Sequence, residues 1–389
     1  MKPSLKFAAC ILLILGVGAG VWWTYRAREA RRARSGPGVA QGKEGKRSPG
    51  LMQSGQAATP VPPAGIPAAV ADNLLQRLAT SLKSGRAEKS RRQLVNLHEE
   101  LRKLPRGEAT RQLLAFLNSG ADAATGLSFA VGHGGGLETA PSMRVAALDW
   151  LGEFDPAAAA DYARQIFATS DSADEWALAL RNYYRQNPTA DAYFVARVGE
   201  AFSRDSWLQN PSAGLAESLD FPVVIGGSEG FGLLQGLLQR SPPMRLAALA
   251  AMDAWVIEQR ATAIPLLVGA NAGALDAGSQ AALLSRADIR DDTQRAAIES
   301  YLAAATVPLS AKAEFLRQFP NQSMIVANHL VTTSLPMSLT ESAQLDAASL
   351  QFVGGLIQAG THPELGNELA ASRERLAGFV ASARRGGKL

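Results

Sequence analysis

Apolar side chains recur at three- and four-residue steps over most of the chain after residue 68, and this spacing places them on one face of an α-helix. Charged residues fill the positions between them, as on the solvated face of an amphipathic helix. Two such series open this part of the chain: Leu74, Leu75, Leu78 and Leu82, then Leu94, Leu97, Leu101 and Leu104. Together they predict an amphipathic pair of helices.

Capping residues mark where further helices begin. Asp155 precedes Pro156, which suits an N-cap followed by a first-turn proline whose missing N–H costs nothing. Ser172–Glu175 and Ser338–Glu341 both fit the Ser-x-x-Glu capping box. Residues 141–205 therefore predict four consecutive helices of about 12–16 residues joined by short turns.

An internal echo connects two distant segments. The sequences PSMRVAALDWL (141–151) and PPMRLAALAAM (242–252) share Pro, Met, Arg and Ala-Ala-Leu at an offset of 101 residues. Three helical hairpins of roughly 34 residues each would span that distance, which is a common size for a helical repeat.

The stretch MRVAALDWLGEFDPAAAADYARQIF, with its short amphipathic helices, close-packing alanines and Asp-Pro opening, resembles HEAT and armadillo-like helical repeats. The likeness covers residues 68–384. It implies an all-α fold, an α-solenoid of antiparallel helix pairs over residues 68–389. It also implies a scaffold that binds a protein or peptide partner, and we expect no catalysis. A purely structural element of the cell envelope without a discrete ligand is an alternative that the sequence does not separate from this scaffold.

The N-terminus predicts a membrane anchor. Residues 7–23 form an uncharged run of 17 residues, at the short end of what spans a bilayer as a helix. Trp22 and Trp23 end this run and Tyr25 lies just beyond it, at the level where aromatic rings favour the headgroups. We assign residues 1–25 to a single transmembrane helix. A cleaved signal peptide ending near Gly18–Gly20 is the alternative, and the charges on either side leave the orientation open.

A spacer is expected between the anchor and the helical part. Residues 26–67 are basic at first and then dense in Gly, Pro, Ser and Gln. Such a composition cannot offset its ordering entropy by burying apolar surface, so a flexible linker is predicted.

Charge is distributed unevenly along the 389 residues, whose sequence pI is 9.3. Residues 1–50 hold ten Lys and Arg against two acidic residues, which leaves 29 basic and 33 acidic residues for the rest. The helical part is therefore mildly acidic and lacks the basic surface of a nucleic-acid binder. The single cysteine, Cys10, excludes a disulfide within the chain and a cysteine-based metal site.

A serine esterase of the α/β-hydrolase type is the alternative function. His133–Gly136 reads His-Gly-Gly-Gly, as in esterase oxyanion loops, and Gly226–Gly230 fits the Gly-x-Ser-x-Gly nucleophile turn with Ser228. His329 would then act as the base. The orienting carboxylate would be Asp288, Asp291 or Asp292. The runs LSFAV, FPVVI and IPLLV could supply strands, and SMIVA does so less clearly.

Several features favour the scaffold over the esterase. An α/β-hydrolase needs strands between its two motifs, yet residues 141–205 are the clearest helical tract in the chain. The glycines serve equally well as a loop before the helix near Pro141 and as the opening of a helix that carries Leu233 and Leu237. We therefore assign no catalytic, cofactor-binding or metal residues and expect no cofactor. The four histidines lack ligand spacing, and the pair Asp291-Asp292 is better explained as an N-cap before Thr293. The tryptophans expected in the core are Trp150, Trp176, Trp207 and Trp255.

Overall fold

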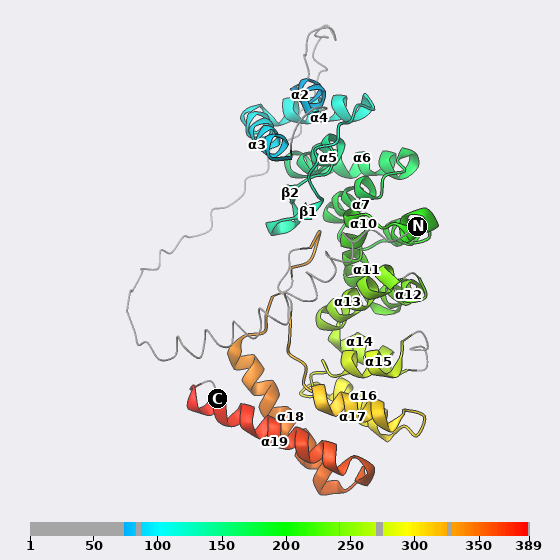
Figure 1. Ribbon diagram of the computed structural model, residues 1–389, viewed down its shortest axis with the longest axis vertical. Helices are drawn as coiled ribbons and strands as arrows, with labels where there is room; N and C mark the ends of the chain where they lie inside the picture. The colour runs from blue at the N-terminus through cyan, green and yellow to red at the C-terminus, as the bar shows by residue number, and fades with distance from the viewer. Residues whose placement is uncertain are drawn as a thin grey trace, which may run out of the picture. The chain divides into compact units, whose positions relative to one another are not determined.

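The computed structural model describes residues 74–82, 87–240, 242–269, 275–324, 329–333 and 335–387, and these are mostly helical, as predicted (Figure 1). Contacts separate residues 1–71 from a compact unit of residues 72–389, to which all that follows refers. The predicted transmembrane segment (7–23) and linker (26–67) lie outside the described residues. None of the helices in the described part is long and apolar enough to cross a membrane.

Three helices open the unit. The predicted pair is present, and its leucines supply the buried face: Leu75 and Leu82 from the first helix, Leu94, Leu97 and Leu101 from the second. A third helix, which we did not predict separately, packs against both. The three are α2 (Leu74–Leu82), α3 (Ala87–Lys103) and α4 (Arg106–Asn118).

A short hairpin follows α4 and contains the glycine-rich sequence. It consists of β1 (Ala130–Val131), the 3-10 turn η1 (His133–Gly135) and β2 (Leu137–Thr139), with the two strands antiparallel. This is the only sheet among the described residues. The glycines thus form the tip of a hairpin next to the helical body.

The four helices predicted in residues 141–205 are present as α5 (Met143–Phe154), α6 (Pro156–Thr169), α7 (Ala173–Gln186) and α8 (Ala192–Ala201). Asp155 caps α6 by accepting the Ala158 N–H. The Ser172 hydroxyl caps α7 by accepting the Glu175 N–H, but the Glu175 carboxylate pairs with Arg144 instead of closing the capping box. The second predicted box, at Ser338 and Glu341, is complete.

The remaining elements are also helical, including two of the runs that the esterase alternative would need as strands. FPVVI forms most of α11 and IPLLV lies in α14, because each apolar run is buried between neighbouring helices and short apolar runs do not by themselves distinguish a strand from a helix. The elements are α9 (Asp205–Gln209), α10 (Ala213–Glu217), α11 (Asp220–Ile225), α12 (Gly227–Leu237), α13 (Pro242–Glu258), α14 (Arg260–Val268), α15 (Ala277–Leu284), α16 (Asp292–Ala303), α17 (Leu309–Gln318), α18 (Leu339–Ala359), the 3-10 turn η2 (Pro363–Leu365) and α19 (Gly366–Arg385).

The helices pack in two alternating series. In the first series α5 packs on α7, and farther along α11 packs on α13, α13 on α15, α15 on α17 and α17 on α19. In the second series α12 packs on α14 and α14 on α16. The core lies between the two series, and it includes Trp176 and Trp255, which are 1% and 0% exposed. Trp150 is also buried, while Trp207 is partly buried and packs edge-on against Trp176.

The sequence echo has a counterpart in an ion pair. Arg144 of α5 contacts Glu175 in the first turn of α7 at 2.7 Å. Arg245 of α13 contacts Asp276, the N-cap of α15, at 3.3 Å. Both pairs span 31 residues. In both copies of the echo, the arginine at the corresponding position therefore connects one helix of the first series to the next helix of that series.

Candidate functional site

A short segment from the connection between α17 and α18 inserts among residues that are far from it in sequence. We call residues 329–333 the finger. The His329 N–H donates to the Thr332 carbonyl oxygen at 3.1 Å, which closes the finger and places Leu330 and Val331 at its tip. In Figure 1 the orange segment before α18 reaches the side of α10 and then returns. The finger tip contacts residues of α7, α11 and the glycine hairpin.

Asp220, the first residue of α11, accepts backbone donors from the finger. Its Oδ2 atom accepts the N–H groups of Val331 at 2.7 Å and Thr332 at 2.9 Å, and its Oδ1 atom accepts the Thr332 hydroxyl. The residue is only 6% exposed, and burial raises the pKa of its carboxyl group, although the hydrogen bonds from Thr332 oppose that shift. Asp220 is thus a desolvated carboxylate whose hydrogen bonds come from the finger.

Arg185, near the end of α7, donates hydrogen bonds to carbonyl oxygens at the same tip. Its Nη2 atom donates to the carbonyl oxygens of Gly134 at 2.5 Å and Leu330 at 3.2 Å. Desolvation, followed by repulsion from Arg181, lowers the pKa of the Arg185 guanidinium to about 10, so the group stays charged at neutral pH. The Leu330 side chain beside it is completely buried.

Gly135 allows the hairpin and the finger to touch. Its φ is +72°, a conformation that favours glycine, and a β-carbon built there would lie 2.2 Å from the Leu330 carbonyl oxygen. The same β-carbon would lie 2.5 Å from the Arg185 guanidinium. The glycine that the esterase alternative assigns to an oxyanion loop is therefore required here for a close approach between two backbones.

A buried ion pair between α5 and α7 holds the hairpin in place. Arg181 of α7 is completely buried, pairs with Asp149 of α5 and donates to the Gly135 carbonyl oxygen at 2.9 Å. The second oxygen of Asp149 accepts the Leu137 N–H at 3.1 Å. A buried arginine needs such a partner set to offset its lost hydration. We define the finger seat as Gly134, Gly135, Arg185 and Asp220, with Arg181 and Asp149 holding its hairpin in place.

His329 lies at the edge of the seat. Its Nδ1 atom is 3.6 Å from the carboxylate of Glu217 in α10. The nearby Glu217 carboxylate is the main factor that raises the pKa of His329, and the negative charge of Asp220 adds to it. The sequence suggested a packed or surface histidine with helical spacing, but the residue lies in the finger and is half-buried.

The connection that leads to the finger is also fixed near its start. The Asn321 N–H donates to the Ser285 carbonyl oxygen at 2.7 Å. Arg286 donates to the Ser323 carbonyl oxygen at 2.7 Å while it pairs with Asp253 of α13. Arginines that hold backbone carbonyl oxygens thus occur at both ends of this connection.

The residues of the esterase alternative do not have the surroundings that the mechanism requires. Ser228 is exposed in the first turn of α12, and the element before it is the helix α11, where a nucleophile turn needs a strand. His133 is exposed at the hairpin tip. His329 pairs with Glu217, which is not one of the predicted aspartates.

The three candidate aspartates have structural partners nearby. Asp288 pairs with Arg290 at 2.6 Å. Of the pair predicted to cap a helix before Thr293, Asp291 is the N-cap of α16 and accepts the Gln294 N–H. Asp292 pairs with Arg295 on the surface of the same helix. In the part of the chain that the structure describes, no cluster of three His, Cys, Asp or Glu side chains is arranged to hold a metal ion.

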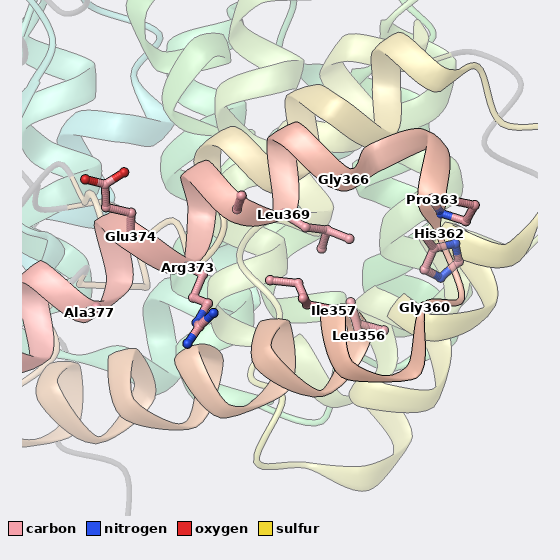
Figure 2. A pocket seen from close by; sticks show the side chains of 11 residues that line it. Leu356, Ile357, Gly360, His362, Pro363, Gly366, Leu369, Arg373, Glu374 and Ala377 are labelled. Carbon is pink, nitrogen blue, oxygen red and sulfur yellow. The ribbon is translucent and has the colours of Figure 1, made fainter.

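A hollow of about 450 Å³ lies between the last two helices. Figure 2 shows Leu356 and Ile357 of α18 facing Leu369 of α19, with His362 at the turn and Arg373 farther along. The lining is largely aliphatic and open to solvent. It offers a packing surface, whereas the finger seat offers directed hydrogen bonds to a polypeptide backbone.

Sequence reasoning missed the residues that make the seat. Arg185 resembles any polar residue near a helix end, and Asp220 stands beside FPVVI, an apolar run of strand-like composition. Leu330 lies in an apolar run read as helical. The available signal was the presence of single charges, Asp220 above all, directly beside strongly apolar residues, because a buried charge needs a specific partner.

Comparison with known proteins adds nothing to this geometry, since no protein-family model, no curated protein and no solved structure matches the chain.

Proposed function

We propose that this chain is a membrane-anchored helical-repeat scaffold that binds a protein or peptide partner. Its body would be an α-solenoid of the HEAT and armadillo-like kind, built from antiparallel helix pairs. The two alternating series of helices and the repeated ion pairs of Arg144 and Arg245 support this reading. A repeat body of this kind presents one extended face along successive helices, which suits it to hold another polypeptide.

The observation that carries the proposal is the finger seat. One face of the body already holds a non-helical piece of polypeptide through donors and acceptors directed at its backbone. Those contacts are the ones that a bound peptide would use, because every peptide carries the same N–H and C=O groups.

The membrane attachment is proposed from the sequence. Residues 7–23 would span the bilayer, and residues 26–67 would keep the helical body away from the headgroups. Such a tether would confine the scaffold to the membrane surface, so that its partner is recruited there.

Site-specific photo-crosslinking in cells tests the proposal. A photoreactive amino acid replaces His133, which is exposed on the hairpin beside the seat, or Asp161, which is exposed on α6 and serves as the control. The full-length chain should form a discrete adduct from position 133 and none from position 161. The partner, identified by mass spectrometry and purified, should then bind the full-length chain directly. Adducts of equal yield from both positions, or none from position 133, would contradict the proposal.

A further inference from the structure

We propose that the finger seat is an exchangeable recognition site. Its partner ligand would be a loop tip of another protein that carries leucine followed two residues later by threonine or serine. This inference rests on the proposed function, and it names the kind of segment that the scaffold recognises. The chain's own finger is then the resident occupant, which a partner loop replaces.

The seat contacts three backbone groups and two side chains of the finger. The backbone groups are the Leu330 carbonyl and the N–H groups of Val331 and Thr332, which any peptide in this conformation supplies. The side chains are that of Leu330, which is 0% exposed, and the Thr332 hydroxyl, which donates to Asp220. Val331 is only partly buried, and Thr333 is exposed. A ligand is therefore specified by an aliphatic side chain and a hydroxyl two positions later.

The charged groups of the seat need an occupant of this chemistry. Among the described residues, the hydrogen bonds that the Asp220 carboxylate accepts come from the finger. Arg185 donates to carbonyl oxygens, of which one belongs to the finger. A buried carboxylate or guanidinium left without its partners is costly, so a replacement must restore the same groups. This requirement selects a polypeptide turn over an apolar helix.

Gly135 adds a steric requirement. Because a β-carbon at this position would lie 2.2 Å from the Leu330 oxygen, the seat accepts a backbone carbonyl in direct contact with the hairpin. A ligand that approached through a bulky side chain would not reach Arg185 and Asp220 together. The seat thus selects the backbone of a narrow loop tip.

The tethered finger gives the site built-in competition. A segment of the same chain acts at an effective concentration on the order of millimolar, so a free ligand binds only as far as it outcompetes the finger. Weakening the finger without changing the seat should therefore increase the affinity for an added ligand.

The test uses a fluorescein-labelled peptide with the sequence of residues 326–336 and the full-length chain in mild detergent. Fluorescence anisotropy measures its binding to the wild-type chain and to Leu330→Asp, whose finger carries a carboxylate that the apolar position rejects. The variant should bind the peptide at least about tenfold more tightly than the wild type, because its own finger no longer competes.

Two controls assign the binding to the seat. The same peptide with Leu330→Asp and Thr332→Val should not bind, and adding Asp220→Ala to the variant chain should abolish binding. No binding by a Leu330→Asp chain whose circular dichroism matches the wild type and which still unfolds cooperatively would overturn the proposal and leave the finger as a fixed strut. In that case the crosslinking from position 133 could still succeed, so failure here is distinguishable from failure of the proposed function.

Hydrogen exchange of the wild-type chain tests whether the finger leaves its seat, even if the Leu330→Asp variant does not fold. The N–H groups of Val331 and Thr332 should exchange at least about a hundredfold faster than those in the middle of α7, because the finger leaves its seat without global unfolding. Exchange at the same rate as the helix core would overturn the proposal. Light scattering provides a further check. A wild-type dimer that becomes monomeric in Leu330→Asp would mean that the seat binds the finger of a second copy, and it would overturn the proposal that the ligand is a loop of another protein.

Discussion

The α-carbon of Gly135 faces the carbonyl oxygen of Leu330 so closely that a β-carbon added to the glycine would lie 2.2 Å from that oxygen. This contact joins the hairpin between α4 and α5 to the connection between α17 and α18. The glycine-rich sequence that suggests an esterase loop thus serves as a surface against which a distant part of the chain packs.

Gly135→Ala should destabilise the fold and release the finger. The substitution combines an unfavourable φ of +72° with a steric clash, and we expect a loss of about 2 kcal/mol or more in the free energy of unfolding. Urea denaturation of the full-length chain measures this loss. The N–H of Val331, which Asp220 accepts in the wild type, should exchange with solvent faster.

The neighbouring glycines separate the two causes. Gly134 has a φ of +70° but no atom within 4 Å of an added β-carbon, so Gly134→Ala should cost only about 1 kcal/mol. Gly136 has a φ of −79° and an equally open surrounding, so Gly136→Ala should change stability by less than about 0.5 kcal/mol. Equal losses from all three substitutions would show that the close approach to Leu330 is unimportant.

Attachment of the finger should weaken as the pH rises past neutrality. The pKa of His329 is raised above its ordinary 6.5, mainly by the neighbouring Glu217 carboxylate, so the folded state favours the protonated ring. This contribution is complete below pH 6.5 and is lost as the pH rises through the raised folded value. The unfolding midpoint, measured in steps from pH 6 to 9, should fall over that window.

His329→Gln should make the same profile flatter. Asp220 also has a raised pKa, and its window runs from about 3.8 up to its own raised value, so the difference between the wild-type and His329→Gln profiles is what reports His329. A wild-type profile that rises over the neutral window, or one that His329→Gln leaves unchanged, would contradict the assignment to His329.

Local signals in the sequence predicted the helices well. Asp155 with Pro156, the Ser338–Glu341 capping box and the spaced leucines each fix a helix boundary or a buried face through contacts within a few residues. Such contacts depend on nearby residues, so periodicity and capping chemistry reveal them. The same reasoning placed Gly226 and Gly227 at the opening of a helix.

The finger seat could not be predicted because its partners are distant in sequence. Asp220 and Thr332 are 112 residues apart, and Arg185 and Leu330 are 145 apart. One sequence gives no information on which of many charged residues meets which backbone group. The sequence of FPVVI was ambiguous for a different reason, because an apolar run of that length is compatible with burial as a strand or as a helix.

Ser228→Ala should leave the fold intact, and it should not abolish an esterase activity, because we expect the wild-type chain to have none. Ser228 is exposed in the first turn of α12, and Gly226, not Ser228, is the N-cap residue. We expect a change in the free energy of unfolding of less than about 0.5 kcal/mol, as for exposed positions in general. A fluorophosphonate probe should not label the wild-type chain. Labelling that disappears in Ser228→Ala would revive the esterase alternative.

The two arginines of the sequence echo, Arg144 and Arg245, form a matched pair. Replacing each one measures what its ion pair contributes to the free energy of unfolding. The side chains of Arg144 and Glu175 are 15% and 7% exposed, and those of Arg245 and Asp276 are 48% and 56% exposed. Arg144→Met removes the charge partner of a buried carboxylate, which typically costs about 3–5 kcal/mol. Arg245→Met breaks a solvated pair, which typically costs about 1 kcal/mol or less.

Urea denaturation of both variants at low and high salt tests this difference. Arg144 also donates to the Leu117 carbonyl oxygen, so its loss should loosen α4 from α5, whereas Arg245→Met should leave the exchange of backbone N–H groups in α13 unchanged. The cost of Arg144→Met should persist at high salt because screening acts weakly on buried pairs, while that of Arg245→Met should vanish. Equal costs for the two substitutions would mean that burial does not distinguish the two copies of the ion pair.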